Sequence, residues 1–380
     1  MPTLPGPLAK FVAAIGRSVA DHRRIWSAIA AVAVVGAGVG IGVAATGSNP
    51  PGPRRAHATT TSSPSIAPVA AVKTARCPLT DTPPTVGDAV PRRPALLVKI
   101  GNEPDGARPQ SGLNEADVVF DTPAEGFIMR YVAVFQCNDA SSIGPTRSAR
   151  WVDWNMIARQ FVSPILAFAG GIDPNVNGIA ATPWLSGANL LEGGQAAGTR
   201  ISSRVAPDNL YTSTSALYAL YRSKMTPPSP IFTFGAKLPV GAKRAKSIQI
   251  DFSGGTDVVW KWDPSAHQWL HTYLGAPDID TLTGKEVSTT NIVVEIAHYT
   301  VGPYIESAGG SGDIESQLIG SGSGYLLRQG TVVPITWHRP DELSPATFTT
   351  PSGTPADLVP GRTWVEIVPD VQAGGIIITP

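Results

Sequence analysis

Hydrophobic and polar positions divide the chain into an apolar segment, a polar segment and a long region of short alternating runs. Residues 25–46, IWSAIAAVAVVGAGVGIGVAAT, hold 22 positions without a charge, enough for a helix to cross a hydrocarbon core of about 30 Å. Residues 47–76 are mostly Ser, Thr, Pro and Ala, and cannot bury enough apolar surface to offset the entropy of ordering. The pattern predicts a transmembrane helix followed by a disordered tether.

Basic residues precede the apolar segment. Residues 1–24 carry four Lys or Arg side chains against one acid, Asp21. An excess of Lys and Arg keeps its end of a membrane helix in the cytoplasm, so we expect a single-pass signal anchor with the folded domains outside. The alternative is a cleaved signal peptide, whose apolar core usually covers about 7–15 residues.

Period-two alternation predicts strands after residue 77. Residues 94–100, 115–121 and 127–137 are short apolar or alternating runs, and turn residues bound the first of them. In the third run Arg130 shares a face with Val132 and Val134, because successive side chains of a strand point to opposite faces. A guanidinium on an apolar face needs an acidic partner, since burial of an unpaired charge is very costly.

Two helices are expected in the same region. Residues 144–146, GPT, form a turn with a capping threonine ahead of residues 147–161, and residues 211–225 form an amphipathic run behind a Thr or Ser cap. The first helix would place Arg147, Arg150 and two tryptophans on one face. Residues 77–235 therefore read as an α+β domain, which the proline-rich TPPSPIF ends.

Residues 236–369 consist almost entirely of strand-like runs. Two hairpins are predicted, VVWKWD with QWLHTYL and SGYLLRQG with TVVPITWHR, beside the strands NIVVEIAHYTV and TWVEIVP. The aromatic stripes that contain Trp260 and Trp269 are typical of core packing rather than of a sugar platform. The whole chain is thus predicted as α+β, with two mixed domains, the second mostly antiparallel β, and a tail at 370–380.

Composition and the absence of known motifs exclude several classes of function. The chain has 29 basic and 29 acidic residues, so no overall field attracts nucleic acid. His267 and His271 lack a metal-site context, and G-x-S-x-G, S-x-x-K and Walker motifs are absent, so no metal or cofactor is expected. Cys77 and Cys137 either form one disulfide in an oxidising compartment or stay as two thiols.

The candidate ligand-binding and acid–base residues lie in residues 108–154. Arginines in the first turn of a helix oppose its macrodipole, so either acidic side chains compensate or the arginines and free backbone N–H groups hold an anion. The first alternative is an internal lattice of arginines and carboxylates that includes Asp153. The second is a site for a phosphate or carboxylate ligand. Both alternatives draw on the same candidate residues: Arg108, Arg130, Arg147, Arg150, Glu115, Asp117 and Glu125.

The segments RPQSGLNEADVVFDTPAEGFIMRYVAVFQ and IGPTRSAR resemble the YerB-like lipoprotein family, which carries paired N- and C-terminal domains of unknown function (DUF3048 type). NIVVEIA, RQGTVVPITWHR and PSGTPADLVPGRTWVEIVP resemble its C-terminal domain, so the likeness covers about residues 93–369. It implies a two-domain extracytoplasmic protein and supplies no catalytic residues. Some members are lipid-modified on a cysteine just after the signal, whereas Cys77 lies about thirty residues beyond the apolar segment.

Three functions follow from these features. The first is a membrane-anchored bacterial envelope protein without enzymatic activity that binds an envelope protein or an anionic cell-wall ligand through the arginines. The second is an enzyme acting on cell-wall or other anionic envelope material, with Glu115, Asp117 and Glu125 as acid and base groups. The third is a scaffold that only positions other envelope proteins.

Overall fold

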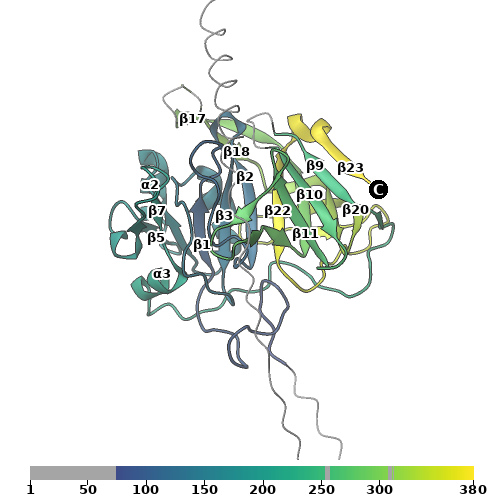
Figure 1. Ribbon diagram of the computed structural model, residues 1–380, viewed down its shortest axis with the longest axis horizontal. Coiled ribbons are helices and arrows are strands. Elements are labelled where there is room, and N and C mark those ends of the chain that lie inside the picture. The colour runs from purple at the N-terminus through teal and green to yellow at the C-terminus, as the bar shows by residue number, and fades with distance from the viewer. Residues whose placement is uncertain (1–73, 253–256, 307–309, 311) are drawn as a thin grey trace, which may run out of the picture. The chain divides into compact units, whose positions relative to one another are not determined.

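A sheet of eleven strands organises the part of the chain that the structure describes (Figure 1). The computed structural model describes residues 74–252, 257–306, 310 and 312–380. Ten strands follow one another across the sheet, and β8 (Lys243–Arg244) pairs with β20 at its side. In spatial order they are β21 (Thr347–Thr349), β20 (Thr331–Arg339), β19 (Gly320–Arg328), β16 (Asn291–Ala297), β22 (Thr363–Pro369), β2 (Val118–Pro123), β3 (Met129–Phe135), β1 (Leu96–Ile100), β4 (Ile165–Phe168) and β5 (Ser186–Asn189).

Strands from both halves of the chain meet in the middle of this sheet. β22 lies between β2 and β16 and runs parallel to both. Asp121 of β2 is thereby the register partner of Glu366 of β22. The two halves are therefore joined by a continuous backbone ladder as well as by side-chain packing.

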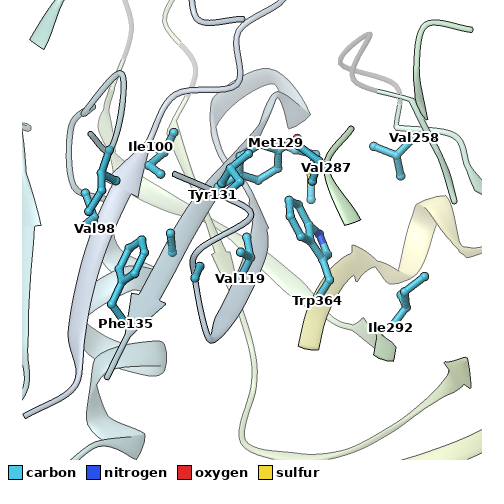
Figure 2. Packing of buried hydrophobic residues seen from close by; sticks show 14 of the residues in the cluster. Val98, Ile100, Val119, Met129, Tyr131, Phe135, Val258, Val287, Ile292 and Trp364 are labelled. Atoms are coloured by element: carbon cyan, nitrogen blue, oxygen red, sulfur yellow. The ribbon is translucent and has the colours of Figure 1, made fainter. Parts of the chain in front are cut away.

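A second sheet packs on one face of the large one. The indole of Trp364 on β22 lies 5.0 Å from the rings of both Tyr131 and Trp260, which belong to different sheets. Figure 2 places Trp364 among Tyr131, Val119 and Ile292 in this buried cluster. The second sheet consists of β12 (Ala276–Pro277), β11 (Gln268–Tyr273), β10 (Val258–Asp263), β9 (Ser247–Ile250) and β23 (Ile376–Thr379), with β15 (Ser288–Thr289) beside β11.

The opposite face of the large sheet is also covered. Leu97 and Val132 point there, while their neighbours Leu96 and Tyr131 point to the second sheet, as the alternation predicted. Because both faces are buried, whole strands such as β1, β2, β3 and β22 contain no exposed residue. Three two-stranded sheets complete the strands: β13 (Ile279–Asp280) with β14 (Lys285–Glu286), β17 (Tyr299–Ile305) with β18 (Gly312–Ser316), and β6 (Thr199–Arg200) with β7 (Leu210–Tyr211).

The predicted α+β class is wrong, because strands dominate the described residues and α-helices are few and short. The two that are labelled in Figure 1, α2 (Asp173–Ala180) and α3 (Thr214–Leu220), have eight and seven residues. Residues 147–161 do not form the expected continuous helix. A helical stretch begins only at Trp151 and continues as a π-helix (Asp153–Ile157) and a 3₁₀ turn (Ala158–Gln160).

Strand-like hydrogen bonds explain the late start of that helical stretch. The Arg147 N–H donates to the Lys99 carbonyl at 3.0 Å, and the Arg147 carbonyl accepts from Ala169 N–H at 2.9 Å. The Ala149 N–H donates to Gly170 at 3.0 Å. These backbone groups are thus bonded to β1 and to the residues after β4, so Thr146 caps no helix and Arg147 lies outside the helical stretch.

The membrane part of the fold prediction also finds no support. Among the described residues no helix is long and apolar enough to cross a membrane. The expected helix at 25–46 and nearly all of the tether at 47–76 lie outside the residues that the structure describes. Residues from Ala70 to Pro380 form one compact unit that contains both hydrophobic clusters, so we expect it to fold without the preceding segment.

Candidate ligand pocket

Three of the predicted arginines lie in one chain of alternating charges. Arg130 on β3 donates to Glu103 at 2.7 Å and to Glu125 at 3.2 Å. Arg147 donates to the same Glu103 oxygen at 2.7 Å and to Asp208 at 2.9 Å. The guanidinium groups of Arg130 and Arg147 therefore face carboxylates rather than an open cleft.

Arg150 extends this chain to the hairpin of β17 and β18. Its guanidinium makes two bonds to Glu125, at 2.7 and 2.5 Å, and lies 3.3 Å from a carboxylate oxygen of Glu306. A carboxylate oxygen of Asp313, at the start of β18, lies 4.0 Å from Nε of Arg150. Figure 1 shows this hairpin beyond the end of β2, at the top of the view.

The carboxylates outnumber the arginines in this cluster. Burial alone would raise the pKa of Glu125, but Arg150 and Arg130 outweigh it and lower that pKa to about 2. Burial raises the pKa of Glu306 to about 7 and that of Asp313 to about 6, although Arg150 opposes both shifts. Three guanidinium groups thus face five carboxylates, counting Glu103 and Asp208, and an added anion would find no unpaired cation among them.

A pocket opens beside the surplus carboxylates. Its volume is 210 Å³, and its walls include Trp151, Trp154, Pro174, Tyr304, Asp313 and Glu315. The first three come from the helical stretch and α2, and the last three come from the β17–β18 hairpin. The pocket therefore requires residues from both halves of the chain.

The polar wall of the pocket is fixed by hydrogen bonds. Asp313 accepts from the Trp151 backbone N–H at 2.8 Å, while its other oxygen is buried and accepts no hydrogen bond. Asn175 accepts from the Trp154 indole at 3.2 Å and donates to Glu306 at 2.7 Å. The aromatic side chains of the pocket thus lie beside carboxyl and amide groups that hydrogen bonds hold in place.

The remaining predicted residues lie elsewhere. Arg108 pairs with Asp278 at 2.7 Å, bonds to Tyr131 and Asn102, and stacks at 3.5 Å over the Tyr273 ring. Its cluster lies on the face of the large sheet that meets the second sheet, whereas Arg130 points to the opposite face.

Asp117 and Glu115 also stay apart from the pocket. Asp117 accepts from the backbone N–H groups of Gln136 and Cys137, and burial raises its pKa to about 6. Next to it Cys77 and Cys137 form a disulfide with a Cα–Cα distance of 6.0 Å. Glu115 is half-buried, with Arg362 as a neighbouring charge. Neither carboxylate is placed for acid–base chemistry in the pocket.

Sequence reasoning missed the residues that complete the pocket. The helical spacing placed Trp151 and Trp154 beside the arginines. It gave no sign of Glu103, nor of Tyr304, Glu306 and Asp313, which lie about 150 residues further along the chain. The available signal was the run GDIES at 312–316, where Asp313 and Glu315 alternate on one face after a glycine-rich loop.

Two family models match most of the chain. Residues 79–226 match the family described as protein of unknown function (DUF3048) N-terminal domain, and residues 248–365 match its C-terminal domain. The chain belongs to the DUF3048 family. YerB, a candidate lipoprotein of Bacillus subtilis (strain 168), is 29% identical over 296 residues, which cover 75% of this DUF3048 chain and 84% of YerB.

A solved structure supports the same assignment. The crystal structure of YerB from Bacillus subtilis has a TM-score of 0.68 and 25% identity to this DUF3048 protein, and covers 80% of this chain and 99% of that one. The two DUF3048 segments do not correspond to separate sheets here. β22, at the end of the second segment, pairs with β2 of the first.

Proposed function

We propose that this protein binds a small saccharide unit of the cell envelope in the pocket of Trp151, Trp154 and Tyr304. The observation that carries the proposal is a pocket whose lining combines these three aromatic side chains with the polar side chains of Asn175, Asp313 and Glu315. Binding sites combine apolar and aromatic walls with a few placed polar groups. Aromatic rings can cover the C–H face of a sugar ring while carboxyl and amide groups bond its hydroxyls.

The size and charge of the pocket narrow the ligand class. Its 210 Å³ is small against the roughly 300–1,000 Å³ of sites for drug-sized ligands, so it suits one ring rather than a long chain. Its two charged lining residues, Asp313 and Glu315, are both acidic, so a neutral or cationic group fits better than an anion. In this proposal the arginines act as counterions that hold Glu125, Glu306 and Asp313 in place.

Two observations support an envelope location. Structural disulfides persist in oxidising compartments such as the bacterial periplasm and cell surface, and Cys77 is bonded to Cys137. The relative YerB carries the name of a lipoprotein. We place the folded unit outside the cytoplasm, at the membrane. Because its Sγ is in the disulfide, Cys77 is not available for lipidation.

The test is a thermal-shift titration of residues 70–380 with soluble N-acetylglucosamine oligomers. At a ligand concentration 100 times Kd, binding should add about 2.7 kcal/mol of stability, or about 4 °C for a unit of this size. Tyr304→Ala is the informative variant, because this side chain is 54% exposed and its loss should not affect folding. Val301→Ala on the same strand, 61% exposed and outside the pocket, is the matched control.

Stabilisation of the wild type and of Val301→Ala, but not of Tyr304→Ala, is the expected result. If none of the three is stabilised by the oligomers while a primary amine such as lysine stabilises the wild type, the ligand is cationic and the saccharide assignment is wrong. If neither probe shifts the wild type, the pocket is not a binding site for either class.

An enzyme acting on envelope glycan is the second candidate. The observation that favours it is that Asp313 and Glu315 share one face of β18, about 7 Å apart along the strand, and both have raised pKa values. Glycosidases use such carboxyl pairs. Release of reducing ends from a glycan by the wild type, lost in Asp313→Asn while binding remains, would establish this activity; binding without release supports the first candidate.

A further inference from the structure

A basic and apolar segment borders the large sheet at β8. Residues 237–246, KLPVGAKRAK, contain four cations and no acidic residue. All four are exposed, and none pairs with an acidic side chain in the part of the chain that the structure describes. These cations are Lys237, Lys243, Arg244 and Lys246.

Apolar side chains lie exposed between these cations. Leu238 is 50% exposed and Val240 is 60% exposed, and Pro239 between them is buried. Single exposed apolar residues are ordinary on a protein surface. Here both lie between Lys237 and Lys243 on one short segment, which combines basic and apolar side chains as membrane-surface elements do.

A pocket of 390 Å³ adjoins the segment. Its lining includes Val240, Tyr325, Val333, Pro334 and Ile378, and Lys243 is the one charged residue that lines it. The walls are mostly apolar, so the pocket suits a hydrocarbon chain whose charged end lies near Lys243. The arginine cluster and the saccharide pocket share none of these residues.

The backbone of the segment is held in place, so its side chains can be changed without unfolding it. β8 pairs with β20 through Arg244 opposite Thr331, and the Ala245 N–H donates to the Gly330 carbonyl at 3.0 Å. The Lys246 N–H donates to the Thr379 carbonyl at 2.7 Å.

We propose that residues 237–246 and the adjoining pocket dock on an anionic lipid bilayer. The four cations would lie at the phosphates of the headgroups, while Leu238 and Val240 enter the boundary of the acyl chains. Three acids lie near the segment. Asp263 follows Trp262, whose N–H donates to the Lys246 carbonyl at 2.8 Å, and its carboxylate accepts from the backbone N–H and the hydroxyl of Ser265. Asp357 lies against Gly235, with Arg328 as its neighbouring charge, and Asp251 lies against Gly375, beyond the other end of β9. A soluble polyanion would engage the cations but would leave the apolar side chains and the pocket without a role.

The test is flotation of residues 70–380 with vesicles, so that the apolar residues 25–46 do not contribute to the result. Vesicles of phosphatidylglycerol mixed with phosphatidylcholine are compared with vesicles of phosphatidylcholine alone. Each Lys or Arg near an anionic leaflet raises partitioning about fivefold. Changing all four cations of the segment to Gln should therefore lower partitioning by more than about 100-fold.

Two controls match the changes in charge and in apolar surface. Arg92, Arg222, Lys261 and Lys285 are exposed cations outside the segment, and their change to Gln alters the net charge equally. Leu238→Ser with Val240→Ser should lower partitioning at least about tenfold, since each buried CH₂ contributes a few-fold. Val86→Ser with Val205→Ser, both positions 80% exposed, should leave it unchanged.

Docking is supported if the wild type floats with phosphatidylglycerol vesicles only and both segment variants lose binding while both controls keep it. It is overturned if the wild type does not prefer phosphatidylglycerol, or if the two four-charge variants bind equally. Binding to soluble polyphosphate without binding to vesicles would also overturn it and would identify a polymeric anion as the partner.

Discussion

The disulfide should supply a large share of the stability of the folded unit. It closes a loop with a sequence separation of 60 residues, and Cys77 and Cys137 are both buried. For a loop of this length the lost chain entropy of the unfolded state corresponds to about 4 kcal/mol at 25 °C. For a unit of about 300 residues, loss of the bond should lower Tm by roughly 6 °C. The bond also joins residues that precede β1 to the end of β3, so it holds the first segment of the domain against the sheet.

The assay is urea unfolding of residues 70–380, compared among the oxidised protein, the protein with reducing agent, and Cys77→Ala with Cys137→Ala. The reduced protein and the double variant should both lose about 4 kcal/mol relative to the oxidised protein. Protein extracted from cells without reductant should contain no free thiol. A loss below about 1 kcal/mol would refute the bond's contribution to stability. Two free thiols in extracted protein would refute the inferred oxidising compartment.

Two further predictions concern buried charges. Lys99 is fully buried and bonded to Asp153 at 2.7 Å. Lys99→Met leaves that carboxylate unpaired, so it should lower the free energy of unfolding by about 3–5 kcal/mol in urea, and adding Asp153→Leu should recover most of this loss. A loss below about 1 kcal/mol would contradict the prediction. Burial raises the pKa of Glu366 to about 7, although hydrogen bonds with Trp260 and Asp121 oppose it. Because this lies above the unfolded value, the folded state binds the extra proton, and stability falls as pH rises from about 4 to 7. Burial and Glu366 also raise the pKa of Asp121 well above its usual value, so the two carboxyls titrate as a pair. Glu366→Gln should therefore lose less stability than the wild type between pH 5 and pH 8 in urea unfolding. An identical loss in both proteins would show that this pair does not titrate as described.

Local patterns predicted most of the strands because alternation and turn residues act over a few neighbours. The runs at 94–100, 127–137 and 363–369 became β1, β3 and β22 with small changes at their ends. The partner of each strand was not in the pattern. That β22 would pair with β2 depends on contacts more than two hundred residues apart in the chain, on which the local sequence carries no signal.

The candidate site divides in the same way. The need of Arg130 for an acidic partner followed from its place on an apolar face, and Glu125 is one such partner. Glu103 and Glu306 come from distant loops, and no local spacing pointed to them. The glycine-rich run 320–324 lies in β19. A Cβ at Gly324 would lie 1.9 Å from the Val294 carbonyl, so this glycine allows two strands to approach.

The position of β22 has a consequence for how the protein is made. Its neighbours β2 and β16 begin at residues 118 and 291, but β22 itself begins only at Thr363. During synthesis or export, the edge of β2 that faces β22 therefore stays unpaired until nearly the whole chain has emerged. Unpaired strand edges invite pairing with other chains. A nascent or truncated chain that stops before Thr363 is thus expected to depend on a chaperone. A chain that includes β22 pairs this strand with both β2 and β16 and leaves neither edge open.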